Sequence, residues 1–324
     1  MRAIQLNSYG DPIENVDVVD IPEPAAPGPG EVLVGMEYAP VNPADLLLAM
    51  GYYTVKPALP SVIGNEGVGT VLALGVGVTT VKAGDRVVAP LSSFTWRERM
   101  LMPSAGLVVL PPQADPQQLA MLAINPVTAQ LILAQFEGLR AGDWIVQNAA
   151  NSGVGRSLIA FSGDRGLKTI NIVRRAELIA DLEAAGGDVV VVDGPDVAER
   201  IKAAIGSAEI KFGLDGVSGA AAATLASLLA NGGTLVSYGA MSNSALSLNP
   251  ADVVFKQLKV KGLFLGDPAH VASFLALIKE GARLIAAGKL NVPVAAIYPL
   301  SAIKQAIAHV QKGGKVLLDI KAAG

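Results

Sequence analysis

The segment QNAANSGVGR, residues 147–156, carries the clearest chemical signal in the chain. It follows the apolar run DWIV and precedes SLIAF, so it lies between a predicted strand and a predicted helix. Such a turn binds phosphate, because helix N–H groups bind the anion and glycines let the backbone approach it. The GxGxxG pattern is incomplete here, which leaves an ordinary strand-to-helix turn as the alternative. The residues predicted to bind the cofactor are Asn151, Ser152, Gly153, Val154 and Gly155.

The end of the next predicted strand, KTINIV, indicates which dinucleotide is bound. An acidic residue there would accept hydrogen bonds from the ribose hydroxyls, but this chain has Arg174 and Arg175. A guanidinium offers a charged fork to a 2′-phosphate, which a carboxylate would repel. The pair therefore favours NADPH over NADH, and the Ser152 hydroxyl could donate to the same phosphate. A solvated strand end is the alternative reading of the two arginines.

Composition restricts the remaining chemistry. The 324 residues include no Cys and two His, which excludes thiol chemistry and makes a zinc site improbable, so no metal is expected. A net charge of −3 without a basic stripe gives no support to a nucleic-acid partner. The mean hydropathy is +0.46, yet the apolar runs are interrupted well before the roughly 18 residues of a membrane span. The first residues resemble no signal or transit peptide, so we expect a cytoplasmic protein without membrane segments.

The elements that must position these residues fall into two predicted domains. Residues 1–118 contain short β-type runs separated by Gly, Pro and Asp turns, and residues 267–324 return to that mixed character. Residues 119–266 alternate aliphatic strands with helices, after a helical stretch that begins near Pro116. This alternation predicts a doubly wound parallel sheet buried on both faces, the Rossmann class. The fold class is therefore α/β, with a nucleotide-binding domain inserted into a β-rich outer domain.

Several motifs together resemble one known family. They are QNAANSGVG, TINIVRR, VNPAD, GNEGVG, TWR and INPVTA. In combination they resemble the zinc-free medium-chain dehydrogenase/reductase superfamily, above all its mitochondrial-type trans-2-enoyl thioester reductases, with quinone oxidoreductase-like proteins as neighbours. The resemblance implies a GroES-like outer domain, a Rossmann domain and NADPH. It also implies reduction of the double bond of a 2-enoyl-CoA or a 2-enoyl-acyl-carrier-protein.

The same resemblance assigns the catalytic group. The family's proton donor is a tyrosine that follows the NPxD motif, and Tyr53 aligns with it better than Tyr52 does. A surface or core-rim aromatic is the alternative role of Tyr53. A phenol suits this chemistry, because hydride addition at the β carbon develops negative charge on the thioester oxygen and a proton must then reach the α carbon. Trp96 is expected to shape the substrate cavity, with a packing role as the alternative. Asn42 could bind substrate through its amide, although Asn-Pro is also a turn signal.

Further cofactor contacts are expected in the inserted domain. Asn125 and Thr128 belong to INPVTA, where the amide of Asn125 could bind the nicotinamide carboxamide or the Asn-Pro pair could mark a turn. Two more pairs end predicted strands at the carboxyl edge of the sheet, where cofactors bind in such folds. These are Tyr238 with Gly239 and Phe264 with Leu265. Glu66 of GNEGVG is taken as structural.

Two alternatives to enoyl thioester reduction stay open at this point. One is an NADPH:quinone oxidoreductase, in which hydride transfer needs no specific proton donor. The other is a catalytically silent NADPH-binding protein. The superfamily resemblance further suggests a homodimer formed at an edge of the Rossmann sheet, with KVKGLFL, residues 259–265, as the candidate edge strand.

Overall fold

The computed structural model describes residues 1–322 and divides into two compact units. Unit 1 contains residues 1–124, 273–288 and 292–324, and unit 2 contains 125–272 and 289–291. The first boundary between the units falls after residue 124, whereas the sequence pattern placed it after residue 118. The second boundary falls after residue 272, whereas the pattern placed it after residue 266. Mixed α/β content of the predicted class is observed, because unit 1 is rich in antiparallel strands and unit 2 holds a parallel sheet.

The parallel sheet of unit 2 has the strand order β10-β9-β8-β11-β12-β13 over the described residues. Its strands are β8 (Trp144–Gln147), β9 (Lys168–Val173), β10 (Val189–Val192), β11 (Ile210–Asp215), β12 (Thr234–Ser237) and β13 (Lys259–Gly262). All neighbouring pairs are parallel. The order reverses between β8 and β11, which is the switch point where ligands bind in doubly wound sheets.

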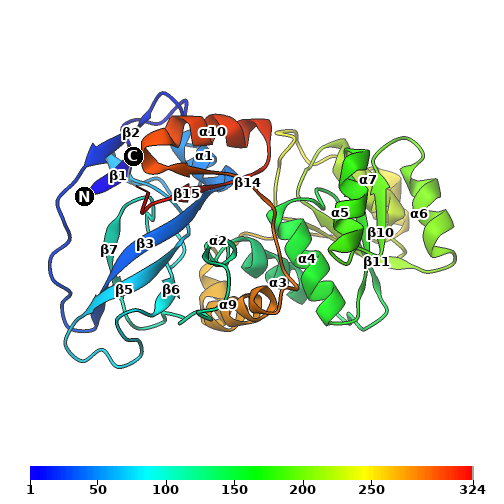
Figure 1. Ribbon diagram of the computed structural model, residues 1–324. Coiled ribbons are helices and arrows are strands. Elements are labelled where there is room, and N and C mark those ends of the chain that lie inside the picture. The colour runs from blue at the N-terminus through cyan, green and yellow to red at the C-terminus, as the bar shows by residue number, and fades with distance from the viewer. Residues whose placement is uncertain (323–324) are drawn as a thin grey trace. The chain divides into compact units, whose positions relative to one another are not determined.

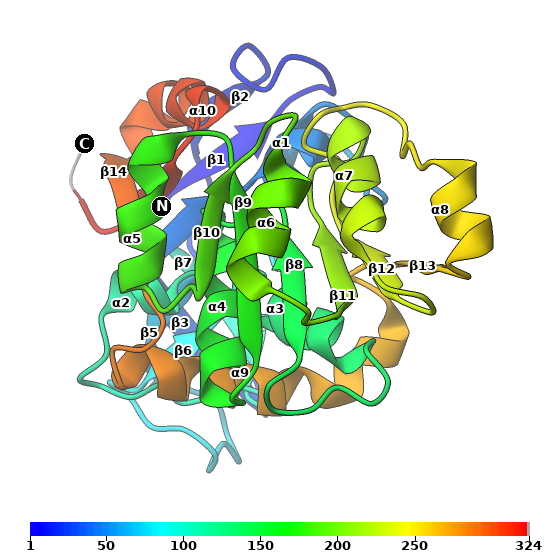
Figure 2. The ribbon, with the colours of Figure 1, turned by 90° about the vertical axis from the view of Figure 1, so that its right-hand side faces the viewer.

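Helices cover both faces of this sheet. On one face α4 (Gly153–Asp164) and α5 (Ile179–Ala184) bury Ile159 and Leu182 in one apolar cluster. On the other, α6 (Val197–Ile205) and α7 (Ala220–Leu228) bury Ile201 and Leu225 against β8, β9 and β11; Figure 2 shows these two helices in front of the strands. Because both faces are covered, inner strands such as β9 and β11 are buried along most of their length rather than on alternate residues.

The remaining elements of unit 2 are α3 (Asn125–Ala134), α8 (Pro250–Phe255) and two short 3-10 turns, η1 (Ala176–Leu178) and η2 (Pro268–His270). The stretch from Pro116 was expected to be one helical segment, but the structure divides it. A short α2 (Pro116–Leu119) is followed by turns, and α3 begins at Asn125. Pro126 fits the first turn of α3, because the N–H that proline lacks has no helical partner there.

Unit 1 is built on a curved sheet of order β14-β15-β3-β5-β6, with β7 paired to β3, within residues 1–322. Its strands are β3 (Glu31–Val41), β5 (Val68–Leu74), β6 (Arg86–Val88), β7 (Arg99–Pro103), β14 (Val294–Pro299) and β15 (Lys315–Asp319). A second sheet pairs β2 (Val16–Asp20), β1 (Arg2–Leu6) and β4 (Ser61–Val62) in the order β2-β1-β4. Figure 1 shows β3 and β5 running side by side through this unit.

Three helices and a 3-10 turn, η3 (Leu300–Ala302), complete unit 1 beside α2. They are α1 (Pro43–Ala49), α9 (Val271–Ala286), whose first residues belong to unit 2, and α10 (Ile303–Lys312). In α10 the buried residues Ile303, Ala306 and Ile307 recur at helical spacing and pack into the core of the sheet. Among the described residues, no helix combines the length and the apolar character that a membrane span requires.

Candidate active site

Parallel strands place the predicted cofactor residues of unit 2 at one edge of the sheet. The loop after β8 leads into α4, Arg174 follows β9, Tyr238 follows β12, and Phe264 follows β13. Since all these strands run the same way, their carboxyl ends share one edge. The strands end slightly earlier than the sequence pattern predicted, at Ser237 and Gly262, so the expected contact residues lie on the loops just beyond them.

The loop from 148 to 152 makes its tight turn without glycine. Ala149 takes the left-handed conformation, with φ 49°, that glycine usually supplies. Ser152 then caps α4, because its hydroxyl oxygen accepts a hydrogen bond of 3.1 Å from the N–H of Gly155. The Ser152 hydroxyl therefore has a structural role as a helix cap, in addition to the phosphate contact expected of it.

Gly153 and Gly155 are required by close packing rather than by backbone freedom. A Cβ at Gly153 would lie 2.6 Å from the side-chain carbon and nitrogen of Asn125. A Cβ at Gly155 would lie 2.5 Å from the carbonyl oxygen of Ala150. The first turn of α4 is thus pressed against α3 and against its own loop. The N-terminus of a helix in this position can bind an anion.

Asn125 has an unusual polar environment. The residue is buried, and its amide nitrogen Nδ2 makes no hydrogen bond within residues 1–322. A buried donor without a partner costs on the order of 1–3 kcal/mol, so such groups call for an explanation. A ligand acceptor beside Gly153 would satisfy this nitrogen. Thr128, one turn further along α3, is buried as well.

The two arginines after β9 differ in their charge environment. Arg175 forms an ion pair of 3.2 Å with Glu177, and its side chain is largely exposed. Arg174 is also exposed and makes neither an ion pair nor a side-chain hydrogen bond with any residue from 1 to 322. Arg174 is therefore the cation that remains available to a phosphate at this edge.

A buried network joins the ends of β8, β11 and β12. Asn148 donates to Asp215 at 2.7 Å, and the side-chain oxygen of Asn148 accepts from the N–H of Gly216 at 2.8 Å. Asp215 also accepts from the Ser237 hydroxyl at 3.1 Å. Burial raises the pKa of Tyr238, which shares a hydrogen bond with Ser152. The network fixes the backbone on which Tyr238 and the loop lie.

The other expected contacts at this edge are more open. Gly239 approaches the neighbouring strand end so closely that a Cβ would lie 2.9 Å from the carbonyl oxygen of Gly216. Phe264 is 44% exposed, and Leu265 is partly buried beside it. The structure brings all of these residues to the predicted edge, while their roles in binding stay predictions.

In unit 1, Asn42 is part of a buried polar network. Its Nδ2 donates to Oε1 of Glu66 at 2.9 Å, and its Oδ1 accepts from Nζ of Lys315 at 2.7 Å. Glu66 is wholly buried, and its second oxygen accepts from the N–H of Ile124 at 2.9 Å. Both ends of the Asn42 amide are thus occupied by protein groups. These contacts support the structural reading of Glu66.

A second carboxyl belongs to the same network. Asp45 accepts from the N–H of Asn42 at 2.7 Å and from the backbone and side chain of Asn65 at 3.0 and 2.8 Å. Burial raises the pKa of both Asp45 and Glu66 to about 7, although their donors and Lys315 lower it in part. Burial also lowers the pKa of Lys315. Two buried carboxyls and one buried ammonium therefore interact electrostatically within one network.

The two neighbouring tyrosines have different environments. Tyr52 is 81% exposed, whereas Tyr53 is partly buried and packs against the core of unit 1. Burial raises the pKa of Tyr53, and the nearby Asp45 raises it further. The phenol of Tyr53 is therefore protonated at neutral pH, as a proton donor must be.

Trp96 lies wholly inside unit 1. Its side chain has no exposed surface, and its Nε1 donates to the carbonyl of Pro40 at 3.2 Å. It packs against Gly64, and Thr95 donates to the carbonyl of Glu66 at 2.7 Å. In unit 1, Trp96 has the environment of a packing residue that supports the turn before Glu66.

Several residues of this arrangement were missed by sequence reasoning. Lys315 begins an aliphatic strand that closes the chain, and Asp215 ends the buried strand β11. A single polar residue at the end of an apolar run was the available signal for both. Asp45 stood inside the VNPAD motif, but only the structure shows that its carboxyl is buried.

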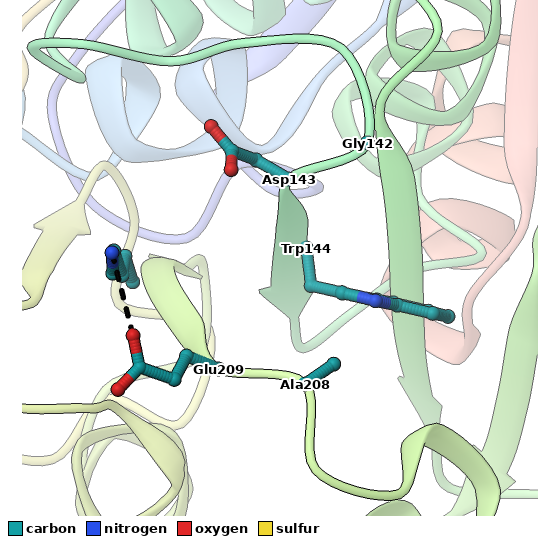
Figure 3. A pocket seen from close by; sticks show the side chains of 6 residues that line it. Gly142, Asp143, Trp144, Ala208 and Glu209 are labelled. Atoms are coloured by element: carbon teal, nitrogen blue, oxygen red, sulfur yellow. Dashed lines mark ion pairs between the residues drawn. The ribbon is translucent and has the colours of Figure 1, made fainter.

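A separate hollow in unit 2 lies away from the loop. Figure 3 shows Asp143, Trp144 and Glu209 around it. These residues lie at or just before the starts of β8 and β11, where Lys211 pairs with Glu209 at 3.3 Å. It is lined by Gly142, Asp143, Trp144, Ala208, Glu209 and Lys211. Because the strands are parallel, this is the opposite edge from the one that bears Arg174. No group of three or more His, Asp or Glu residues within 1–322 is placed to hold a metal ion.

Comparison with known proteins places the chain in a family. Residues 28–109 match the model for the alcohol dehydrogenase GroES-like domain, and residues 153–280 match the model for zinc-binding dehydrogenases. The mitochondrial enoyl-[acyl-carrier-protein] reductase of Bos taurus is 36% identical over 309 residues, which cover 93% of this chain and 83% of the relative.

Two solved structures agree with the fold over almost the whole chain. A complex of Etr1p, a mitochondrial 2-enoyl thioester reductase of Candida tropicalis, with NADP and crotonyl-CoA superposes with a TM-score of 0.88. It is 24% identical, and the match covers 98% of this chain and 99% of the other. A Bacillus thuringiensis protein provisionally described as an NADPH:quinone reductase is 25% identical, with a TM-score of 0.87 and 98% coverage of both chains. The chain therefore belongs to the medium-chain dehydrogenase/reductase superfamily, in the family of the mitochondrial enoyl-[acyl-carrier-protein] reductases.

Proposed function

We propose that this protein is an NADPH-dependent reductase of the carbon–carbon double bond of 2-enoyl thioesters. The observation that carries the proposal is the similarity to an enoyl-[acyl-carrier-protein] reductase, at 36% identity over 93% of the chain. The similarity extends through both units, so it includes the segment with Tyr53 as well as the phosphate loop.

The described residues of unit 2 fit NADPH. The N-terminus of α4 and its loop would hold the pyrophosphate, and Arg174 would pair with the 2′-phosphate. The unpartnered Nδ2 of Asn125 would donate to an acceptor of the cofactor beside Gly153. When bound, the cofactor supplies a hydride to the β carbon of the substrate.

Tyr53 would supply the proton. Hydride addition places negative charge on the thioester oxygen and the α carbon, and the O–H of Tyr53 would first donate a hydrogen bond and then release its proton to the α carbon. Its raised pKa keeps the proton on the phenol until that charge develops. Solvent then restores the proton of the phenolate, so one hydride and one proton are added to the double bond.

A quinone acceptor is the second candidate, because the Bacillus thuringiensis structure matches at 25% identity with a TM-score of 0.87. In that reaction the hydride passes to the quinone without a specific donor. Tyr53→Phe separates the two reactions, with Tyr52→Phe as the matched control on the exposed neighbour. Loss of crotonyl-CoA reduction in Tyr53→Phe alone, with NADPH binding intact, supports the thioester reaction. Equal rates in both variants would sink the donor assignment.

The carrier of the acyl group is a separate question. Crotonyl-CoA, a long-chain enoyl-CoA and an enoyl-acyl-carrier-protein, each followed by NADPH oxidation, distinguish a small-thioester enzyme from one that needs the carrier protein. Binding of NADPH without turnover on any thioester or quinone would point to a catalytically silent protein instead.

We also propose that two copies associate along β13. This strand ends the sheet order, and apolar side chains are exposed beside it on α8, where Phe255 is 80% exposed. Open strand edges and exposed apolar surface favour pairing with a second copy. Phe255→Glu should shift the sedimentation mass toward the monomer, whereas Val76→Glu, at an equally exposed site in unit 1, should not. A cytoplasmic location also remains a proposal.

A further inference from the structure

Lys315 has an unusual set of contacts for a buried ammonium group. Its Nζ donates to Oδ1 of Asn42 at 2.7 Å, and no carboxylate lies within 4.0 Å of it in the described part of the chain. The Nδ2 of the same Asn42 amide donates a hydrogen bond to Glu66 at 2.9 Å. The ammonium is therefore held against a neutral amide, and it attracts Glu66 and Asp45 over a longer distance.

Asn42 in turn fixes the start of α1. It is the N-cap residue, and its backbone N–H donates to Asp45 in a capping box. The helix has seven residues, which is too short to be stable without tertiary contacts. Its orientation therefore depends on what holds its two ends.

The other end of α1 leads directly to Tyr53. The backbone N–H groups of Tyr52 and Tyr53 both donate to the carbonyl of Leu47, at 2.8 and 3.2 Å. A rotation or shift of α1 would therefore move the Tyr53 backbone with it. Contacts that are continuous from Lys315 through Asn42 and α1 reach the phenol that we assign as proton donor.

We propose that Lys315 is a positioning residue for Tyr53, acting through Asn42 and α1. The inference rests on the proposed function, in which Tyr53 is the donor. It gives Lys315, a residue of β15, a part in the reaction. Lys315 touches neither substrate nor cofactor in this role. It holds the amino end of the helix whose carboxyl end carries the donor.

Electrostatics adds to this geometry. The charge of Asp45 raises the pKa of Tyr53, and Lys315 opposes the charge of Asp45 and Glu66. Removing the ammonium would leave two buried carboxyls that repel each other beside Asn42. One carboxyl would then become neutral or the network would rearrange, and either change would alter the contacts that hold the start of α1.

Three substitutions separate the hydrogen bond from the charge. Lys315→Met removes both, Lys315→Gln retains a donor without the charge, and Lys315→Arg retains both in another shape. Lys321→Met is the matched control, because Lys321 lies just beyond the same strand and pairs with Glu37 at 3.3 Å with an exposed side chain. Urea unfolding and NADPH binding of each variant test whether it folds, and Lys315→Gln replaces Lys315→Met if the latter does not.

The test is a double-mutant cycle with Tyr53→Phe, followed by crotonyl-CoA reduction. We expect Lys315→Met to lower kcat roughly 10-fold to 100-fold with NADPH binding unchanged, since small displacements of a reacting group have costs of that order. Lys315→Arg should restore part of the rate, and Lys321→Met should leave it unchanged. In the Tyr53→Phe background Lys315→Met should have little further effect, because both act on one group.

The outcomes distinguish this inference from the proposed function. If wild type reduces crotonyl-CoA and Tyr53→Phe does not, but Lys315→Met has an effect of full size in the Tyr53→Phe background, the positioning role is wrong. An unchanged kcat in Lys315→Met would overturn it as well. If wild type is inactive on thioesters, or Tyr53→Phe is fully active, the proposed function fails and this inference fails with it.

Discussion

Arg174→Ala should weaken NADPH binding and leave NADH binding unchanged. Arg174 is exposed at the end of β9 and is not neutralised by a carboxylate among the described residues, so its charge is available to the 2′-phosphate. Hydrogen bonds to charged groups contribute about 1.5–3 kcal/mol, equivalent to roughly 10-fold to 150-fold in Kd. Because solvent screens this exposed site, we expect the lower end, about 10-fold.

Arg175→Ala is the matched control for this prediction. Arg175 neighbours Arg174 but already pairs with Glu177 at 3.2 Å, so its loss should change the NADPH Kd less. Fluorescence titration of both cofactors with wild type and both variants gives four ratios to compare. The Arg174 effect should shrink at about 0.5 M salt, where the Debye length is only a few ångströms. Equal weakening of NADPH and NADH by Arg174→Ala would refute the 2′-phosphate assignment.

Two further predictions concern packing and pH. Gly153→Ala should destabilise the protein by about 1–3 kcal/mol in urea unfolding and weaken NADPH binding, because its Cβ would overlap Asn125. Gly163→Ala is the control, because this glycine of the same helix has open space around it, and the change should be neutral or slightly stabilising. Because the pKa of Glu66 is raised, the native state holds a proton that the unfolded chain releases near pH 4.5. This proton contributes to the free energy of unfolding at lower pH, and the contribution is lost as pH rises toward about 7. Glu66→Gln should flatten that part of the pH dependence by on the order of 1–3 kcal/mol, and an unchanged profile would contradict the assigned pKa shift.

The sequence predicted the fold through patterns that are local. Aliphatic runs alternating with helical segments indicate a parallel sheet, and the turn before Gly153 marks the switch between strand and helix. The division of the stretch from Pro116 into two helices was not predicted, because PQQL and NPVT are each compatible with a continued helical pattern. Only contacts distant in the chain, such as that of Gln118 with Val292 at 2.8 Å, show what holds the break.

The network around Asn42 could not be predicted for the same reason. Lys315 and Asn42 are far apart in the sequence, and antiparallel pairing of β15 with β3 brings them together. From its NP motif, Asn42 was expected either to bind through its amide or to mark a turn. In the structure both ends of that amide have protein partners, whereas the buried Asn125 has an unpartnered nitrogen. Which amide is available depends on tertiary contacts that spacing does not encode.

The central claim is tested most directly by crotonyl-CoA reduction with wild type and Tyr53→Phe, measured as NADPH oxidation under the same conditions. We expect turnover by wild type, with NADPH preferred over NADH. We expect kcat in Tyr53→Phe to be lower by a factor of roughly 100 or more, since a general acid contributes at least that factor. Turnover of a quinone with none of any enoyl thioester, or a Tyr53→Phe variant as fast as wild type, would contradict it.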